Sequence, residues 1–448
     1  MTTVKCVVFG MGYVGIPIAA LLADIEGFSV IGVQRRSERS GWKIDVLNRG
    51  ESPFRGKEPG LDELIAEVVK KGTFSVTDDP SVAREADYIL IDVQTPTDAT
   101  NVPQYESLKN VSQQVGKYLQ KGTTVIIEST VAPGTTENVV KPILEEYSNL
   151  KAGEDFFLSF SYERVMPGKL IEYIINMPRV VGGINQESTN KTVWLYQHIV
   201  KREISTTSCL SAELAKTIEN SYRDVNIAFA NEMALLCESL KVNIFEIIEL
   251  INARYDRHMH IPGAGVGGHC LPKDPWLLRY GVQTYGRGFM EPEFISLGRK
   301  INNHMPIHLG NLADLALEKK GIPLTKARIT ILGIAYLEDS DDTRNTPALP
   351  LIKYLQSRGA RITVHDPYVN PDSYDEWPIE NDLALALKNA NCAIIVTKHA
   401  EYYRLDLDWL RNDLMTTPIL IDGRNVFNQE FVEKKGFYYI GIGKKHDF

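Results

Sequence analysis

Apolar residues follow two different periods along the chain, and each period predicts a different kind of element. In about the first 200 residues, and again after Lys326, short apolar runs rich in β-branched residues alternate with helical patterns. This alternation is typical of parallel sheets whose strands are covered by helices on both faces. The predicted strands are Val4–Phe9, Ser29–Val33, Tyr88–Val93, Thr124–Glu128, Phe156–Phe160 and Arg179–Val181, then Arg328–Leu332, Arg361–His365, Cys392–Thr397 and Ile419–Asp422.

The middle of the chain has a helical period instead. It predicts one long helix from Ser211 to about Leu240, a segment without Pro or Gly. Its apolar positions include Leu214, Ile218, Val225 and Phe229. Shorter helices should follow, interrupted by a Gly-rich loop at Pro262–His269 and bent at Pro306. The stretch Pro367–Pro378, rich in Pro, Asp and Tyr, should be a surface loop.

These patterns predict an α/β fold with two Rossmann-like, doubly wound parallel-sheet domains, joined by a long central helix and a helical middle domain. The expected boundaries are residues 1–205, 206–322 and 323–448.

Composition narrows the class of protein. The 448 residues carry 49 basic and 57 acidic side chains, a net charge of −8, which argues against binding to nucleic acid. The five cysteines show no paired spacing, so neither disulfides nor a metal site is expected. No apolar run suits a signal peptide or a membrane span. We therefore expect a cytoplasmic protein that does not interact with membranes.

A glycine motif follows the first predicted strand. Gly10-Met11-Gly12-Tyr13-Val14-Gly15 lies between that strand and a predicted helix, which is the context of a dinucleotide-binding turn. The helix N-terminus would offer N–H groups to a pyrophosphate. A turn used only for packing is the alternative.

The end of the second predicted strand leaves two cofactors open. A carboxylate that would hold the ribose 2′-hydroxyl is expected there, but Gln34 occupies the position, followed by Arg35 and Arg36. The arginines could bind the 2′-phosphate of NADP, or they could be solvated while Gln34 binds the ribose. We favour NAD, with NADP as the alternative.

A cysteine stands in the Gly-rich stretch Pro262–Pro275. Lys273 and His269 could favour the thiolate of Cys270, and Asp274 could orient a partner or accept a proton. An inert, buried thiol is the alternative.

Polar residues at three other places suggest a site. Lys216 and Asn220 are four positions apart, on one face of the long helix, although a solvated stripe is the ordinary reason for such a pair. The loops Glu128–Thr136 and Ser161–Gly168 each follow a predicted strand, where open α/β sheets bind ligands. Their alternatives are turn formation and, for Glu163 and Arg164, a surface ion pair.

In this order the segments resemble the UDP-glucose/GDP-mannose dehydrogenase family along essentially the whole chain. The matching pieces are Gly10–Gly15, Glu58–Leu61, Thr95-Pro96, Glu128–Thr136, Glu163-Arg164 with Pro167-Gly168, Lys216 to Asn220, Gly267–Asp274, Gly333–Tyr336, Asp342–Asn345 and Asp422–Asn425.

The resemblance implies a fold and an activity. The N-terminal domain would bind NAD, the central helical domain would carry the cysteine loop and form a homodimer or larger homo-oligomer, and the C-terminal domain would bind the UDP-sugar. The chain would be an NAD-dependent nucleotide-sugar 6-dehydrogenase, which oxidises the C6 alcohol to a carboxylate with two NAD per turnover.

The resemblance also implies roles for six residues. Cys270 would form a thiohemiacetal with the C6 aldehyde and then a thioester. The others would assist it: Lys216 by stabilising the oxyanion, Asn220 by holding the C6 oxygen, Asp274 and Thr130 by positioning water or accepting a proton, and Glu163 by helping thioester hydrolysis.

Binding residues follow in the same way. Cofactor contacts would come from Gly10, Met11, Gly12, Tyr13, Val14, Gly15, Gln34, Arg35, Thr95, Pro96, Ser129, Thr130 and Arg344. Substrate contacts would come from Glu163, Arg164, Val165, Lys216, Asn220, Arg254, Gly263, Gly267, Tyr336 and Arg424.

Gly-Gly-His-Cys270, rather than Gly-Gly-Ser-Cys, resembles the branch that acts on UDP-N-acetylhexosamines. UDP-N-acetyl-D-mannosamine is our first choice of substrate, for a uronic acid used in a surface polysaccharide or glycan. The N-acetylglucosamine and N-acetylgalactosamine epimers and UDP-glucose are alternatives.

Two departures from the family stand out. Leu337 follows Tyr336 where the family has a lysine that contacts the nucleotide sugar, and Tyr162 replaces the usual proline. Arg254, Arg257 or Arg424 could compensate for the lysine.

Two other functions are open. A two-electron hydroxyacid-type dehydrogenase would share the cofactor domain but have no use for Cys270. A non-catalytic cofactor sensor would bind a dinucleotide and reduce none.

Overall fold

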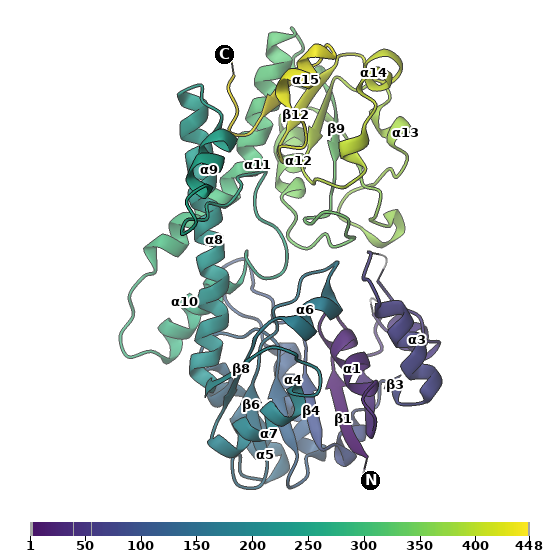
Figure 1. The fold of residues 1–448 in the computed structure, drawn as a ribbon, viewed down its shortest axis with the longest axis vertical. Helices are drawn as coiled ribbons and strands as arrows, with labels where there is room; N and C mark the ends of the chain where they lie inside the picture. Colours follow the sequence, from purple (N-terminus) through teal and green to yellow (C-terminus); the bar gives the residue numbers. More distant parts are fainter. Residues whose placement is uncertain (1–2, 39, 55, 447–448) are drawn as a thin grey trace. The chain divides into compact units, whose positions relative to one another are not determined.

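The computed structural model describes residues 3–38, 40–54 and 56–446 and divides the chain into two compact units (Figure 1). The N-terminal unit comprises the residues up to Asn220 together with Lys273–Glu291. The C-terminal unit comprises Ser221–Pro272 and the residues from Pro292 onward. The three-part division expected from the sequence stays a prediction.

The N-terminal unit is built on an eight-stranded sheet with the order β3-β2-β1-β4-β5-β6-β7-β8. All neighbouring strands are parallel except β6 and β7, which pair antiparallel. The strands are β1 Val4–Phe9, β2 Phe28–Val33, β3 Phe74–Thr77, β4 Tyr88–Ile91, β5 Thr124–Ile127, β6 Phe157–Phe160, β7 Arg179–Gly183 and β8 Ile204–Ser208.

Helices cover both faces of this sheet, which explains the continuous apolar runs of its strands. Cys6 and Val8 of β1 pack in one core, whereas Val7 and Phe9 pack in another on the opposite face. The helices are α1 Gly15–Ala23, α2 Trp42–Asn48, α3 Leu61–Lys71, α4 Glu106–Tyr118, α5 Lys141–Ser148, α6 Leu170–Asn176, α7 Gln186–Tyr196 and α10 Asp274–Tyr285.

The predicted long helix is confirmed as α8, Cys209–Ser239, and the boundary between the units falls within it. The C-terminal unit adds α9, Ile244–Asn252, and α11, Glu293–Lys319. The helices that follow α8 are shorter than its 31 residues, as predicted, and Pro306 lies inside α11, which continues through it over 27 residues.

The second sheet, in the C-terminal unit, has the order β10-β9-β11-β12-β13 and is parallel throughout. Alternate residues again face two cores: Ile394 points to one and Ile395 to the other. Its elements are β9 Arg328–Leu332, α12 Ala348–Ser357, β10 Arg361–His365, α13 Leu383–Leu387, β11 Cys392–Ile395, α14 Leu407–Trp409, β12 Ile419–Asp422, α15 Gln429–Lys434 and β13 Tyr438–Gly441. The predicted α/β class with two parallel-sheet domains is therefore confirmed.

Three strands escaped the sequence prediction, namely β3, β8 and β13. Each lies at the edge of its sheet, where a strand has a single neighbour. Strand β8 reads Ile-Ser-Thr-Thr-Ser and is mostly exposed, so it lacks the apolar run that marks a buried strand.

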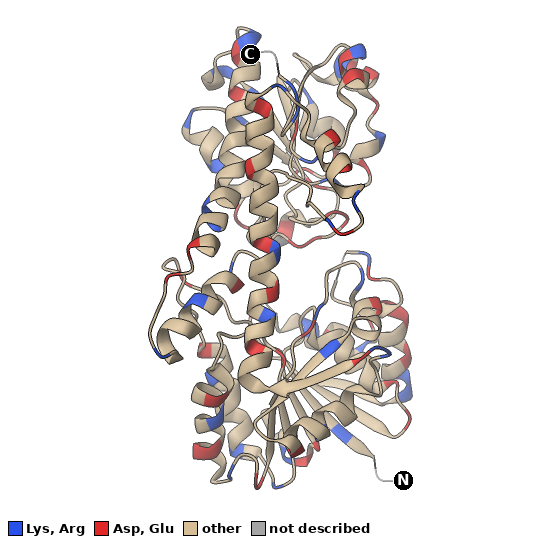
Figure 2. Ribbon diagram, turned by 60° about the vertical axis from the view of Figure 1, so that its left-hand side comes forward, with Lys and Arg blue, Asp and Glu red and all other residues tan. Residues whose placement is uncertain are grey.

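Charged residues of both signs are interspersed along the helices and loops (Figure 2). Among the residues that the structure describes, no helix is long and apolar enough to cross a membrane.

A buried polar cluster lies where β4, β5 and β7 end or begin. The Arg179 guanidinium forms an ion pair with Glu128 and lies 3.7 Å from the centre of the Tyr196 ring, and the Tyr196 hydroxyl donates to Glu128. The Asp92 carboxyl lies next to this pair, and its Oδ2 atom is buried. Burial, together with the neighbouring Glu128, raises the pKa of Asp92 well above its ordinary value.

This raised pKa predicts that Asp92→Asn stabilises the protein at high pH. In the folded chain Asp92 keeps its proton to a higher pH than in the unfolded chain, so stability is lost as pH rises from about 4 towards the folded pKa. The side-chain amide of asparagine has the shape of the carboxyl group but does not ionise, so the variant does not lose stability as the pH rises. We expect Asp92→Asn to raise the thermal midpoint at pH 8, by the equivalent of roughly 1–3 kcal/mol, and to change little near pH 4.

Asp98→Asn is the matched control. The exposed Asp98 carboxylate accepts hydrogen bonds from Thr100 and Val102, which lower its pKa, so this variant should not raise the midpoint at pH 8. A lower midpoint for Asp92→Asn at pH 8 would contradict the assignment.

Candidate active site

The glycine motif forms a cradle at the start of α1. A side chain at Gly10, which has a φ of 106°, would meet the carbonyl oxygen of Asp92 at 2.3 Å, and one at Gly15 would meet the carbonyl oxygen of Gly10 at 2.0 Å. At Gly12 no atom lies within 4 Å of where a Cβ would stand. The open side at Gly12, next to a helix N-terminus, fits the pyrophosphate of a dinucleotide.

The other predicted cofactor residues surround this turn or the neighbouring strand ends. Gln34 accepts a hydrogen bond from the backbone N–H of Met11 at 3.1 Å, and Tyr13 stacks on Phe54 with ring centres 4.4 Å apart. The remaining residue of the turn, Val14, precedes α1 directly.

The loops after β4 and β5 are tied together. Thr95 donates to the carbonyl oxygen of Thr130 at 2.6 Å, and Ser129 donates to that of Val93 at 2.7 Å. Pro96 is exposed beside them. Four of the predicted residues therefore meet at the carboxyl ends of two adjacent strands, where this kind of sheet binds ligands.

Helix α8 presents three buried or half-buried polar side chains at positions i, i+3 and i+7, and we call Glu213, Lys216 and Asn220 the polar stripe. Each contacts a different segment of the N-terminal unit: Glu213 the loop after β5, Lys216 the loop after β6, and Asn220 the start of α10. Residues at these spacings share one helix face.

Lys216 is not part of a solvated stripe. It is 4% exposed and donates from Nζ to the carbonyl oxygen of Glu163 at 2.7 Å and to Glu163 Oε1 at 3.4 Å. The alternative of a surface ion pair between Glu163 and Arg164 was also wrong, since Arg164 pairs with Glu219, at 2.9 Å. Val165 completes this loop by donating its N–H to Glu163.

Asn220 belongs to a second chain of hydrogen bonds. Its amide donates to Asp274 Oδ2 at 2.5 Å, and Asp274 Oδ1 pairs with Lys273 Nζ at 2.9 Å. Lys273 in turn lies 3.4 Å from the hydroxyl of Thr95, which donates to Thr130. The N-terminal unit thus connects Asn220 and Asp274 to the backbone carbonyl of Thr130 through Lys273 and Thr95.

Glu213 was not among the predicted site residues. It is fully buried and accepts hydrogen bonds from the N–H groups of Gly134, at 2.6 Å, and Thr136, at 2.8 Å. Burial raises its pKa to about 7, although these hydrogen bonds oppose the shift. Its position three residues before Lys216 was the available signal, because it lies on the same helix face.

The Gly-rich loop before Cys270 lies in the C-terminal unit, and its glycines approach neighbouring residues too closely for a side chain. A Cβ at Gly267 would stand 2.5 Å from the Cβ of Tyr336, and one at Gly263 would stand 2.8 Å from Arg424 Nη1. The structure therefore places Gly267 against Tyr336 and Gly263 against Arg424. Cys270 follows this loop and is partly exposed, so it is not buried in the core.

Three arginines have different surroundings within the C-terminal unit. Arg424 donates to the carbonyl oxygens of Val396, at 2.7 Å, and Gly265, at 3.3 Å. Arg344, predicted to contact the cofactor, forms an ion pair with Asp342, and its carbonyl oxygen accepts from the N–H of Gly268. The side chain of Arg254 is largely exposed and pairs with Asp256 at 2.7 Å.

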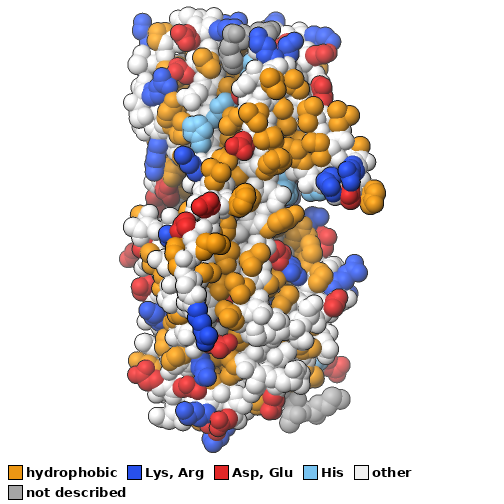
Figure 3. Space-filling model, turned by 90° about the vertical axis from the view of Figure 1, so that its left-hand side faces the viewer, with side chains coloured by type: hydrophobic (Ala, Val, Ile, Leu, Met, Phe, Trp, Pro, Cys, Tyr) orange, Lys and Arg blue, Asp and Glu red, His pale blue; other side chains and the backbone are white. Residues whose placement is uncertain are grey.

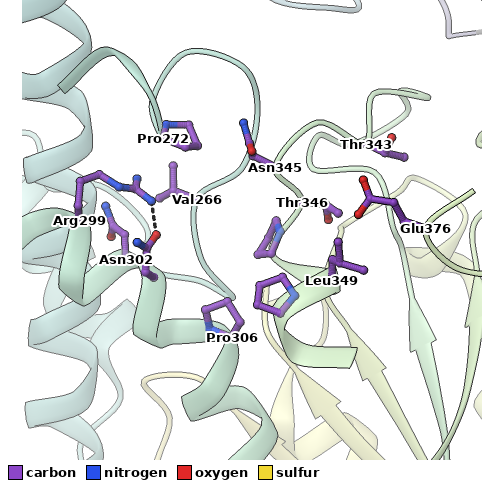
Figure 4. A pocket seen from close by; sticks show the side chains of 13 residues that line it. Val266, Pro272, Arg299, Asn302, Pro306, Thr343, Asn345, Thr346, Leu349 and Glu376 are labelled. Carbon is purple, nitrogen blue, oxygen red and sulfur yellow. Dashed lines mark hydrogen bonds between the residues drawn. The ribbon is translucent and has the colours of Figure 1, made fainter. Parts of the chain in front are cut away.

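A cavity of about 360 Å³ opens beside the Gly-rich loop (Figure 4). Arg299 and Asn302 of α11 line one side of it, while Thr346 and Leu349 line another. Both α11 side chains are fixed by Asp224 of α8, at 2.7 and 2.8 Å. The C-terminal unit therefore offers a hollow with polar and apolar lining next to the cysteine loop.

Comparison with known proteins accounts for both units. Residues 4–200 match the NAD binding domain of the UDP-glucose/GDP-mannose dehydrogenase family, residues 210–304 its central domain and residues 330–429 its UDP binding domain. The chain belongs to this family. It is an NAD-dependent oxidoreductase of the UDP-sugar dehydrogenase class.

Members of the UDP-glucose/GDP-mannose dehydrogenase family match the chain over nearly its full length. The UDP-N-acetyl-D-mannosamine dehydrogenase of Pyrococcus horikoshii is 36% identical over 98% of this chain and 99% of the relative. A solved UDP-D-ManNAc dehydrogenase structure from that organism superposes with a TM-score of 0.89 and covers the same shares. The structure of an NDP-N-acetyl-D-galactosaminuronic acid dehydrogenase from Methanosarcina mazei Go1 is 42% identical, covers 99% of this chain and 96% of that one, and has a TM-score of 0.85.

The buried pair of this dehydrogenase, Lys273 and Asp274, generates a stability prediction. The two side chains are 5% and 0% exposed, so Lys273→Met leaves a buried carboxylate without its ammonium partner. We expect a loss of about 3–5 kcal/mol, seen as a lower thermal midpoint.

Two further variants complete this test. The double variant Lys273→Met/Asp274→Asn should recover most of the loss, since it leaves no buried charge. Lys121→Met, which breaks an exposed pair with Asp155, should leave the midpoint almost unchanged. Equal losses in the single and the double variant would contradict the pairing.

Proposed function

We propose that the enzyme oxidises C6 of a UDP-N-acetylhexosamine, with UDP-N-acetyl-D-mannosamine as the first choice, from the alcohol to the uronic acid. The product would serve the synthesis of a surface polysaccharide or glycan. Full-length relatives from Pyrococcus horikoshii and Campylobacter jejuni, named UDP-N-acetyl-D-mannosamine dehydrogenases, are 36% and 34% identical to the chain and support this choice.

One observation carries the proposal: the polar stripe of α8 contacts the loops that follow the strands of the cofactor-binding sheet. Lys216 contacts Glu163 and Asn220 contacts Asp274, which places one lysine–carboxylate contact and one amide–carboxylate contact on one face of a helix. A protein that only sensed the cofactor would have no need of such groups. Acids and bases placed in pairs are typical of sites that move protons.

The overall reaction consumes the sugar alcohol, two NAD and water, and yields the carboxylate, two NADH and three protons. NAD, when bound, accepts one hydride in each of the two oxidations. Between them the Cys270 sulfur adds to the C6 aldehyde carbon, which gives a thiohemiacetal, and the second oxidation turns this adduct into a thioester. Water then cleaves the thioester and releases the carboxylate and the free thiol.

The other residues would support these steps. Lys216, held through Glu163, would stabilise the negative charge that develops on the C6 oxygen, and Asn220 would hold that oxygen. Asp274 and Thr130 would accept the proton or position the water, and Glu163 would assist thioester hydrolysis. Gly263, Gly267, Tyr336 and Arg424 would contact the nucleotide sugar, and Arg424 would supply a positive charge in place of the lysine that is missing at Leu337.

The galacto epimer is a second candidate substrate. The Methanosarcina mazei structure of the NDP-N-acetyl-D-galactosaminuronic acid dehydrogenase is 42% identical to the chain. Epimers differ in the direction of one substituent, so the choice depends on the shape of the sugar pocket.

We also propose that the enzyme is a homodimer through α8. Within the C-terminal unit, large apolar side chains recur along one face of this helix at seven-residue spacings and are more than half exposed: Tyr222, Phe229 and Leu236. Leu240, directly after the helix, is exposed as well. Figure 3 shows hydrophobic side chains gathered on the side of the molecule that this helix occupies. A surface helix with such a stripe is typical of a helix-packing interface.

Cofactor stoichiometry tests the reaction. With UDP-N-acetyl-D-mannosamine, its epimers and UDP-glucose tried in turn, we expect two NADH per sugar consumed and a uronic acid product. Cys270→Ser should lose the acid product, because a hydroxyl is a far weaker nucleophile than a thiol. One NADH per sugar, or full turnover by Cys270→Ser, would favour a two-electron dehydrogenase, and no NADH with any sugar would favour a cofactor sensor.

Replacing Lys216 tests the role of the polar stripe. We expect Lys216→Met to lower turnover on the order of a hundredfold or more, because the developing oxyanion loses its charged partner. Dinucleotide binding, measured by calorimetry, should persist and show that the variant is folded. Lys109→Ala, an exposed lysine of α4, is the control. A loss smaller than about tenfold would rule out the oxyanion role.

A further inference from the structure

The segment after β2 supplies the side chains that contact the adenosine ribose of the dinucleotide in a Rossmann fold. In Rossmann folds an acidic residue at this strand end binds the 2′-hydroxyl and repels a 2′-phosphate. Residues 34–38 here read Gln-Arg-Arg-Ser-Glu, so an uncharged amide occupies the position of the acid. The carboxylate of Asp78, at the end of the neighbouring strand β3, is paired with Arg36.

Gln34 is fixed as a structural bridge. Its Oε1 accepts from the N–H of Met11 at 3.1 Å, and its Nε2 donates to the hydroxyl of Ser40 at 3.0 Å. Ser40 is in turn 2.9 Å from the hydroxyl of Ser37. The side-chain amide thus ties the glycine turn to the segment after β2 and holds that segment close to the ribose position.

The two arginines that follow are not equivalent. Arg36 donates from Nε to Asp78 at 3.0 Å, so its charge is already matched by a carboxylate of the segment after β3. Arg35 is exposed, and its guanidinium forms no hydrogen bond or ion pair with any residue of 3–38, 40–54 or 56–446. Of the two arginines, Arg36 is paired with a carboxylate, so the positive charge of Arg35 is the one available to a ligand.

We infer that this segment is a 2′-phosphate site, that Arg35 is the residue that contacts the phosphate, and that the enzyme binds NADP as well as NAD. A guanidinium matches a phosphate with two parallel N–H donors, and the missing carboxylate removes the repulsion that excludes NADP elsewhere. The hydroxyls of Ser37 and Ser40 are neutral groups that accommodate the ribose with or without its phosphate.

Calorimetric titration of the full-length protein with NAD and with NADP tests this inference without a sugar substrate, so its outcome is independent of the proposed reaction. We expect a Kd for NADP no more than about tenfold above that for NAD, since a charge-assisted contact offsets the desolvation of the phosphate. Raising the salt concentration should weaken the binding of NADP more than the binding of NAD, because salt screens an exposed contact between Arg35 and the phosphate. A wild-type ratio larger than tenfold overturns the inference.

Variants assign the contact. Arg35→Ala should weaken the binding of NADP at least about tenfold more than the binding of NAD. A tenfold loss is the size expected for one charge-assisted hydrogen bond. Arg36→Ala, the matched control one residue away, should change the ratio of the two Kd values less than about threefold. Gln34→Asp should restore a preference for NAD. It should weaken the binding of NADP on the order of a hundredfold relative to that of NAD, because a carboxylate then faces the phosphate. An unchanged ratio in Arg35→Ala, or a larger change in Arg36→Ala, overturns the assignment to Arg35.

Discussion

Buried polar groups on one helix must each find a partner, and the site of this enzyme depends on how α8 meets that requirement. A buried ammonium, carboxylate or amide without a hydrogen bond is costly, so Glu213, Lys216 and Asn220 fix the loops that satisfy them. Glu213 holds the backbone at Gly134 and Thr136, and Lys216 holds the carbonyl of Glu163. The geometry of three separate loops is therefore set by a single rigid element.

The two sheets use carboxylates at their strand ends in different ways. In the second sheet, Asp366 accepts four backbone N–H groups, and Asp422 accepts those of Arg424 and Phe427. Both carboxylates hold loop backbone in place, and Asp366 also contacts His399 while Asp422 accepts from the Tyr439 hydroxyl. In the first sheet Glu128 is matched by Arg179, whereas Glu163, in the loop after β6, faces Lys216. The same position in one architecture thus provides structure in one sheet and candidate chemistry in the other.

The sequence was informative where a local pattern determines the structure. The apolar runs placed β1, β9, β10 and β12 to the residue, and the glycine spacing placed the cofactor turn at the start of α1. Strand β8 was missed because an edge strand with one apolar residue leaves no periodic signal. The sequence also did not predict that Lys216 is buried, because its partner Glu163 lies 53 positions away in the chain and only the folded structure brings them together.

The three glycines of the cofactor turn are required for different reasons. Gly10 and Gly15 are required by the fold itself, because a side chain at either would run into backbone whether or not a ligand is present. Gly12 faces open space, so the folded chain tolerates a larger residue there and only an incoming dinucleotide does not. Selection for a stable protein would therefore preserve two of these glycines, whereas only selection for cofactor binding would preserve the third.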